Sequence, residues 1–151
     1  MVDIDIIRLS VPGSLRYRDL VLRVVASACR LMRSMAIGKQ EPSRDQHQFD
    51  DEVVSAVGEA FNNVAIHAYR DLSPGAVELE LELRSDSITI RMSDTGRRFE
   101  PSVERPPDLA SLPESHMGLF IVRSFMDQVT YRPGTAAVPN VLTLTKRYVT
   151  S

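Results

Sequence analysis

The stretch VELELELRSDSITIRMSDTG, residues 77–96, decides the fold class of this chain of 151 residues. Apolar residues alternate with glutamates over residues 77–83, as they do in a strand that buries one face and exposes the other. The alternation resumes over residues 88–92, after a turn-forming pair. The stretch therefore predicts an antiparallel hairpin whose second strand runs directly into Asp94 and Gly96.

A strand and two helices are expected before this hairpin. Alternation over residues 4–11 predicts a first strand, and Ser14 is a suitable N-cap for a long helix over residues 15–37. Residues 38–49 are polar and contain a proline, so they predict an exposed connection. A second helix is expected over residues 50–68, because two aspartates begin it and apolar residues recur along it at helical spacing.

A long loop, a third helix and two strands are expected after the hairpin. Residues 97–115 contain four prolines and little periodicity, and such loops are usually functional or mobile. Residues 117–129 show a helical pattern, and strands are expected at residues 128–132 and 140–148. This order predicts one α+β domain, residues 1–151, built as a two-layer sandwich with a mostly antiparallel mixed sheet and helices on one face.

The composition argues against several classes of protein. The formal net charge is −2, with 18 basic and 20 acidic residues, so no global field favours nucleic acid or an anionic membrane. Arg16, Arg23 and Arg30 lie seven residues apart and form either an ordinary solvated helix face or a surface for an acidic protein partner. A single cysteine, Cys29, and an N-terminus without a signal-peptide pattern predict a cytoplasmic protein with no membrane segment.

Polar residues at intervals of four mark the second helix. Glu59, Asn63 and His67 share one helical face in the stretch EAFNNVAIHAY, residues 59–69. Such a face is either the ordinary polar edge of an amphipathic helix or part of a site. An asparagine oxygen is a suitable ligand for magnesium, and a glutamate one turn away can reach a proton beside the metal. The face therefore suits phosphate chemistry.

Two further motifs lie at the ends of predicted elements. Asp94 and Gly96 follow a strand, where they form either a plain turn or a site whose carboxylate accepts a hydrogen bond from the amine of adenine. Gly118 lies where the long loop becomes a helix, and it belongs either to an ordinary helix start or to a site for phosphate oxygens. Neither motif identifies a function by itself.

The order of these motifs resembles a known family. An acid and an asparagine on a helix, Asp-x-Gly after a strand, a long loop and a glycine at a helix start resemble the nucleotide-binding boxes of the ATPase fold shared by gyrase and histidine kinases, the Bergerat fold. EAFNNVAIHAY, SDTGRRFEP and MGLFIVRSFMDQVTY are similar to the anti-sigma factor serine kinases, which are small bacterial switch proteins. The resemblance extends over nearly the whole chain.

The resemblance implies a role for each matching residue. Glu59 would be the general base toward an attacking hydroxyl, and Asn63 would be the magnesium ligand. His67 matches a histidine often found at that place, and it is expected either to be structural or to support the residues that bind the ligand. Asp94 would read the adenine of ATP, with Gly96 beside it.

Further implied contacts come from the last third of the chain. The amides of Gly118 and Leu119 would meet the phosphates of ATP. Thr143 or Thr145, on the last predicted strand, would support the adenine through water. Residues from about 97 to 117 would form the lid over the nucleotide.

The implied activity is that of an ATP-dependent, Mg²⁺-dependent protein serine/threonine kinase. Such a kinase phosphorylates a small anti-anti-sigma partner with a STAS domain and also sequesters a sigma factor, so that it acts as a partner switch in transcription. The family further implies a homodimer that makes no direct contact with nucleic acid or membrane.

One departure from the family supports an alternative function. Ser115 and His116 stand in the expected lid where relatives commonly carry glycines, which alters or weakens closure of the loop over the phosphates. The alternative is a catalytically weak or inactive nucleotide-binding module that docks partners in a bacterial regulatory switch.

Overall fold

The computed structural model describes residues 4–37, 44–98 and 114–148. Five strands form one sheet in the order β1-β2-β3-β5-β4. The strands are β1 (Asp5–Pro12), β2 (Ala76–Leu83), β3 (Ser87–Asp94), β4 (Gln128–Arg132) and β5 (Asn140–Arg147). Every neighbouring pair in this sheet is antiparallel, so the expected mixed sheet is corrected to an antiparallel one.

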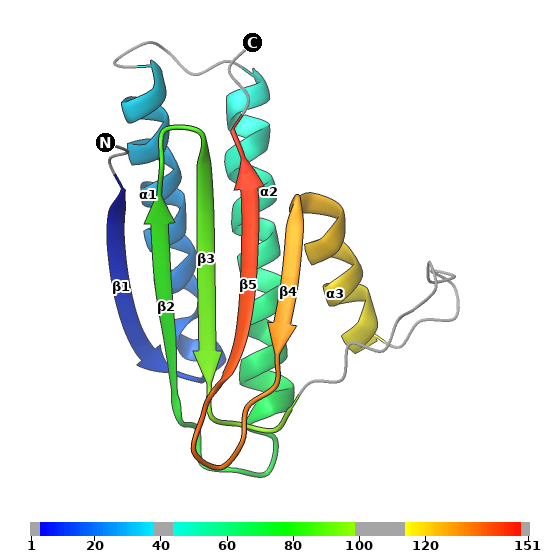
Figure 1. Ribbon diagram of the computed structural model, residues 1–151. Coiled ribbons are helices and arrows are strands. Elements are labelled where there is room, and N and C mark those ends of the chain that lie inside the picture. The colour runs from blue at the N-terminus through cyan, green and yellow to red at the C-terminus, as the bar shows by residue number, and fades with distance from the viewer. Residues whose placement is uncertain (1–3, 38–43, 99–113, 149–151) are drawn as a thin grey trace.

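Helices cover one face of the sheet, and α3 packs beside α2 next to β4 (Figure 1). The helical elements are the 3-10 turn η1 (Leu15–Tyr17), α1 (Arg18–Ile37), α2 (Arg44–Asn62), the π-helical segment η2 (Asn63–Ala68) and α3 (Glu114–Phe125). Ser14 caps η1, as its position predicts, by accepting a hydrogen bond from the amide of Arg16. The predicted α+β architecture is therefore confirmed. None of the helices in the described ranges is both long enough and apolar enough to span a membrane.

The hydrophobic core lies between the sheet and the helices. In β2, Leu79, Leu81 and Leu83 face the helices and are at most 2% exposed. The helices contribute residues such as Cys29, whose side chain is fully buried. Burial raises the pKa of the Cys29 thiol to about 12, so this cysteine is a small core residue rather than a reactive one.

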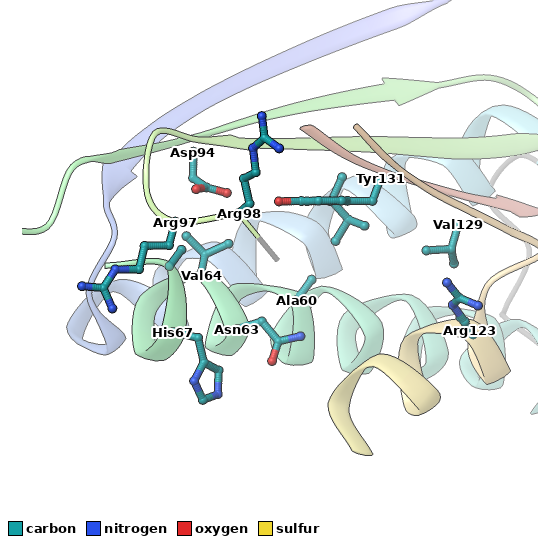
Figure 2. Close-up of a pocket in the computed structure, with 12 residues that line it drawn as sticks. Ala60, Asn63, Val64, His67, Asp94, Arg97, Arg98, Arg123, Val129 and Tyr131 are labelled. Atoms are coloured by element: carbon teal, nitrogen blue, oxygen red, sulfur yellow. The ribbon is translucent and has the colours of Figure 1, made fainter. Parts of the chain in front are cut away.

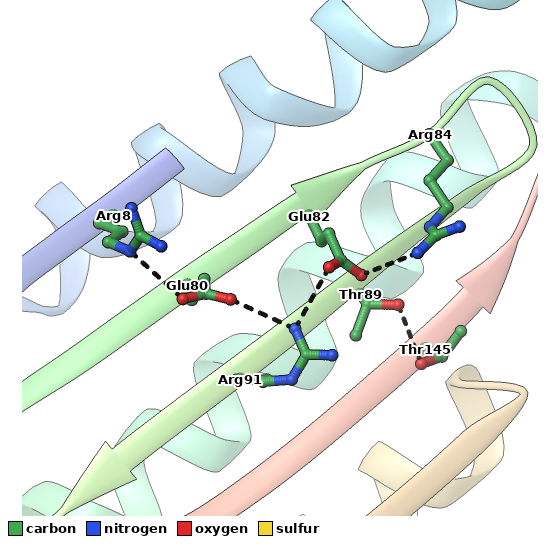
Figure 3. A network of polar contacts seen from close by, with 7 residues as sticks. All are labelled: Arg8, Glu80, Glu82, Arg84, Thr89, Arg91 and Thr145. Carbon is green, nitrogen blue, oxygen red and sulfur yellow. Dashed lines mark hydrogen bonds and ion pairs between the residues drawn. The ribbon is translucent and has the colours of Figure 1, made fainter. Parts of the chain in front are cut away.

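The opposite face of the sheet carries a ladder of ion pairs (Figure 3). Glu80 lies between Arg8 and Arg91, at 3.3 and 3.4 Å, and Glu82 lies between Arg91 and Arg84. Exposed pairs of this kind contribute only about 0–1 kcal/mol each. The ion pairs therefore add little stability, and they show that this face of the sheet is exposed to solvent. This agrees with the glutamates that alternate with leucines in β2.

Two helices begin earlier than the sequence predicts. α2 begins at Arg44, within a stretch expected to be a connection, because this polar segment has tertiary partners. Phe49 packs edge-on against Tyr148, with ring centroids 5.3 Å apart, and Asp50 forms a largely buried ion pair with Arg33 of α1. α3 begins at Glu114 rather than at residue 117. Most of the expected lid, residues 99–113, lies outside the described residues.

The two layers should depend on the inward leucines and not on outward ones. Replacing Leu81, which is 1% exposed, with alanine is expected to lower the free energy of unfolding by about 2–5 kcal/mol, because it removes buried methyl groups and leaves a cavity. The matched change Leu31→Ala, at a residue 55% exposed on α1, is expected to cost less than about 0.5 kcal/mol. Urea unfolding followed by circular dichroism measures both. Equal losses in the two variants would contradict this assignment of the core.

Candidate functional site

The C-terminal end of α2 widens into a π-helix, η2, over Asn63–Ala68. The amide of Tyr69 accordingly bonds the carbonyl oxygen of Val64, five residues back, at 3.3 Å. Short π-helical segments within helices are rare and frequently mark functional sites. The side chains of Asn63 and His67 leave the same side of this helix (Figure 2), so these two residues of the predicted polar face share one side despite the change of pitch.

A cavity of about 270 Å³ lies between η2, α3 and the ends of strands β3, β4 and β5. Its lining residues are Ala60, Asn63, Val64, His67, Ala68, Asp94, Arg97, Arg98, Arg123, Val129, Tyr131 and Leu142. Two predicted site residues from separate parts of the chain, Asn63 and Asp94, therefore meet in one place, and His67 lies there with them. Apolar side chains such as Val129 and Leu142 form much of the wall, as is usual for small-molecule sites.

Asp94 is held at the sheet side of this cavity by two donors. It is 6% exposed, and its Oδ1 atom accepts hydrogen bonds from the amide of Gly96 at 2.9 Å and from Nδ2 of Asn140 at 3.0 Å. Burial raises the pKa of Asp94 above the usual range of an aspartate, while these two hydrogen bonds oppose the shift. Within the described part of the chain, the Oδ2 atom accepts no hydrogen bond, so it is available to a ligand.

Gly96 is required by the close approach of its loop to the end of η2. A Cβ atom at this position would lie 2.6 Å from the carbonyl carbon of Ala68, closer than real side chains come. The next residue, Arg97, donates its amide to the carbonyl oxygen of Ala68 at 2.7 Å. The glycine therefore allows strand β3 and the π-helix to meet, and this junction sets the depth at which Asp94 enters the cavity.

Tyr69 also stabilises the junction between β3 and η2, through hydrogen bonds of its hydroxyl. Its hydroxyl accepts a hydrogen bond from the amide of Thr95 and donates one to the carbonyl oxygen of Ala76, both at 3.0 Å. The residue as a whole is 6% exposed. This role could not be predicted from the sequence, because a tyrosine at the end of an amphipathic helix is an ordinary core residue.

Of the remaining predicted residues, Glu59 is not among the described residues that line the cavity. Glu59 is half-buried on α2, one turn before Asn63. Gly118 and Leu119 lie in α3 but one turn inside it, beyond the first free amides of a helix that starts at Glu114. The roles predicted for these three residues stay predictions.

The expectation for Thr143 and Thr145 is corrected by their place in the sheet. Thr143 pairs with Arg91 in the strand register and lines a separate hollow with Thr145 on the solvated face, opposite the helices. The reason is the alternation of β5, in which Leu142 points into the cavity and Leu144 into the core. Neither threonine therefore lies on the side of the sheet where a ligand in the cavity would be.

Three arginines that the sequence did not single out line the cavity. Arg97 and Arg98 follow strand β3, within the stretch SDTGRRFEP, and Arg123 comes from α3, so the pair and the third arginine are far apart in the chain. Of the described lining residues, Asp94 is the only acid. The excess of positive charge suits an anionic ligand.

A metal ion at this site would be coordinated by oxygens of the bound ligand as well as by the protein. The described residues contain no cluster of three or more His, Cys, Asp or Glu that could hold an ion. Asn63 makes no side-chain hydrogen bond with the described residues, so its amide oxygen is free for a cation. One protein oxygen beside a polyphosphate fits Mg²⁺, which usually keeps water and substrate oxygens among its ligands.

Known proteins are similar to this chain over part or most of its length. Residues 19–146 match the family model of the histidine kinase-like ATPase domain. An anti-sigma F factor of Clostridium botulinum is 33% identical over 98 residues, which are 60% of this chain and 64% of that protein. An anti-sigma F factor of Clostridium beijerinckii is 34% identical over 84 residues, 51% of this chain and 57% of that protein. The serine-protein kinase RsbW of Staphylococcus aureus is 29% identical over 135 residues, 83% of this chain and 78% of that protein.

The matched segment spans less than two thirds of the length of these two anti-sigma F factors. The resemblance drawn from the three sequence motifs is confirmed by these matches.

The junction at Gly96 gives a test of the site's architecture. Gly96→Ala is expected to lower the free energy of unfolding by about 1–3 kcal/mol, because the added methyl group meets the backbone of Ala68, which cannot move away independently. Gly58→Ala is the matched control. Its methyl group would meet only the flexible end of Arg18, at 2.6 Å, and alanine favours the helix, so we expect a change within about 1 kcal/mol. Urea unfolding of both variants distinguishes them, and a Gly96→Ala protein as stable as the wild type would refute the close approach.

Proposed function

Because the chain belongs to the histidine kinase-like ATPase domain family, we propose that it binds Mg-ATP in the cavity beside η2 and transfers a phosphoryl group to a serine or threonine of a protein partner. The observation that supports this most directly is the meeting of Asn63 and Asp94 in one apolar cavity rimmed by arginines. Asp94 suits the base of a nucleotide, and Asn63 with the arginines suits its metal-bound, negatively charged polyphosphate.

The sheet side of the cavity would hold the base. The free Oδ2 atom of Asp94 can accept a hydrogen bond from the exocyclic amine of adenine, and the buried surroundings strengthen that bond. Val64 and Leu142 line the cavity with apolar surface against which a flat ring can pack. In cofactor sites a few polar groups usually orient the ligand, and apolar walls pack against it.

The α3 side of the cavity would hold the phosphates. Asn63 would offer its amide oxygen to Mg²⁺, and the ion, when bound, supplies charge neutralisation at the phosphate oxygens. Arg123 lies on the α3 side of the cavity and is exposed, so it can approach the polyphosphate as a second source of positive charge. The chain's own contribution is thus to position the nucleotide and to balance its charge, which is most of what phosphoryl transfer requires.

Glu59 would act on the attacking hydroxyl. It lies one turn before Asn63 on the continuous helix formed by α2 and η2, so a proton acceptor stands close to the proposed metal ligand. A carboxylate in this place can orient a serine or threonine hydroxyl and take its proton as the phosphoryl group is transferred.

The relatives supply the partners in this proposal. One is named a serine-protein kinase and others are named anti-sigma F factors. We therefore propose a switch in which this chain, as a homodimer, either holds a sigma factor or phosphorylates a small STAS-domain antagonist of its own action. Neither partner is expected to be nucleic acid or membrane.

A second candidate function is a docking module that binds nucleotide weakly and transfers no phosphate. The position of Thr143 and Thr145 on the far face of the sheet favours it, because the adenine end then lacks the threonine expected there. The two candidates differ in phosphoryl transfer, not in fold.

Calorimetry with Mg-ATP and a phosphotransfer assay test the proposal together. We expect the wild type to bind ATP, and Asn63→Ala and Asp94→Ala to lose most of that binding, because each removes one end of the site. Glu59→Gln should keep the ATP affinity while transfer to a STAS-domain anti-anti-sigma protein falls by about 10²–10⁴-fold. Wild-type protein that binds ATP without transferring phosphate identifies the docking module, and folded protein that binds no ATP contradicts both functions.

The raised pKa of Asp94 gives the binding a pH dependence with a definite sign. Only the ionised carboxylate accepts two donors at Oδ1 and an amine at Oδ2, so ATP affinity should fall as pH decreases toward the Asp94 pKa, which burial places above the usual aspartate range. Asp94→Asn stays uncharged at every pH and separates this effect from titration of the phosphates. The ratio of wild-type to Asp94→Asn affinity should therefore approach one at low pH, and a constant ratio would contradict the role of the carboxylate.

A further inference from the structure

A buried amide connects Asp94 to the turn between β4 and β5. Asn140, the first residue of β5, is 4% exposed. Its Nδ2 atom donates to Oδ1 of Asp94 and to the carbonyl oxygen of Gly96, each at 3.0 Å. Its own Oδ1 atom accepts a hydrogen bond from the amide of Gly134 at 2.7 Å. All the hydrogen-bonding groups of Asn140's side chain are thus engaged with the residues around Asp94.

The orientation of this amide follows from the chemistry of its partners. The amide of Gly134 can only donate, whereas the carbonyl oxygen of Gly96 can only accept, so the nitrogen and the oxygen of the Asn140 side chain cannot be exchanged. A donor is therefore always directed at Oδ1 of Asp94. Together with the amide of Gly96 it fills both lone pairs of that oxygen.

The position of Asn140 is set by the fold and not by a ligand. Gly134 is buried in the turn, where a Cβ atom would lie 2.6 Å from the carbonyl carbon of Pro139. Arg98 holds the same glycine from the loop after β3, with its Nε atom donating to the carbonyl oxygen at 3.1 Å. The turn is thus fixed on both sides, so Asn140 meets Asp94 before any nucleotide arrives.

We propose that Asn140 is a positioning residue that limits Asp94 to one free acceptor oxygen and thereby selects adenine over guanine nucleotides. The inference rests on the proposed function, since it concerns the base end of the same cavity.

Adenine and guanine differ in the hydrogen-bond donors that they present to a carboxylate. Adenine offers one exocyclic amine beside a ring nitrogen that accepts, so a single oxygen, Oδ2, satisfies it. Guanine offers a ring N–H beside an amine, and these two donors pair best with both oxygens of one carboxylate. With Oδ1 of Asp94 already filled, guanine can make only one of those bonds and leaves a desolvated donor unpaired, which is costly in a buried site.

Binding of Mg-ATP, Mg-GTP and Mg-ITP to the wild type and to Asn140→Ala tests this inference by calorimetry. ITP has the ring N–H of guanine but no 2-amine. We expect the wild type to prefer ATP and to bind GTP no better than ITP, because the 2-amine finds no partner. In Asn140→Ala the ratio of ATP to GTP affinity should fall by about threefold to tenfold as one acceptor position is released. Thr143→Val, on the same strand but on the solvated face, should leave the ratio unchanged.

The possible results distinguish a failure of this inference from a failure of the proposed function. A purely structural role for Asn140 would weaken ATP and GTP alike, so an unchanged ratio in folded Asn140→Ala overturns the inference while the proposed function stands. Circular dichroism confirms folding of the variant. If the variant does not fold, the wild type still decides, because GTP binding tighter than ITP binding would show that both oxygens of Asp94 are available. A wild type that binds none of the three nucleotides overturns the proposed function and the inference with it.

Discussion

The contact on which this site depends is a backbone contact, that of Gly96 with the carbonyl group of Ala68. It joins the end of a strand to the end of a helix without any side chain between them. Because β3 is the central strand of the sheet, the contact fixes the helix end to the middle of the sheet. The hydroxyl of Tyr69 and the amide of Asn140 then complete the junction with hydrogen bonds to Thr95 and Gly96.

The cavity follows from that junction. Once the helix end and β3 are held together, Asp94 and Asn63 stand on different walls of one space, and residues from β4, β5 and α3 close it. The walls are mainly apolar, while the charged groups lie at the rim or are held by buried partners. This arrangement concentrates polar recognition at a few atoms whose directions are already set, which lowers the entropic cost of orienting a ligand.

The strands and the polar helix face could be predicted because their signals are local. The alternation of β2 and β3 and the spacing of Glu59, Asn63 and His67 are visible in short windows, and the order of motifs along the chain identified the family. The start of α2 could not be predicted, since its polar first turns are stabilised by distant contacts. Asn140 escaped notice for the same reason, because its three partners lie on other segments. Thr143 was misplaced because residues of one strand alternate between faces, and composition alone does not tell which face is which.

The burial of Cys29 has a practical consequence for experiments on the whole molecule. It is the only cysteine in the sequence, its side chain on α1 is fully buried in the core, and its thiol stays protonated at neutral pH. It therefore cannot react with an alkylating reagent until the helix layer opens. Its labelling rate therefore reports the frequency of that opening in native conditions, with no engineered probe. A ligand that tightens the layer will slow the labelling, so this one thiol can detect binding to a site whose residues it does not touch.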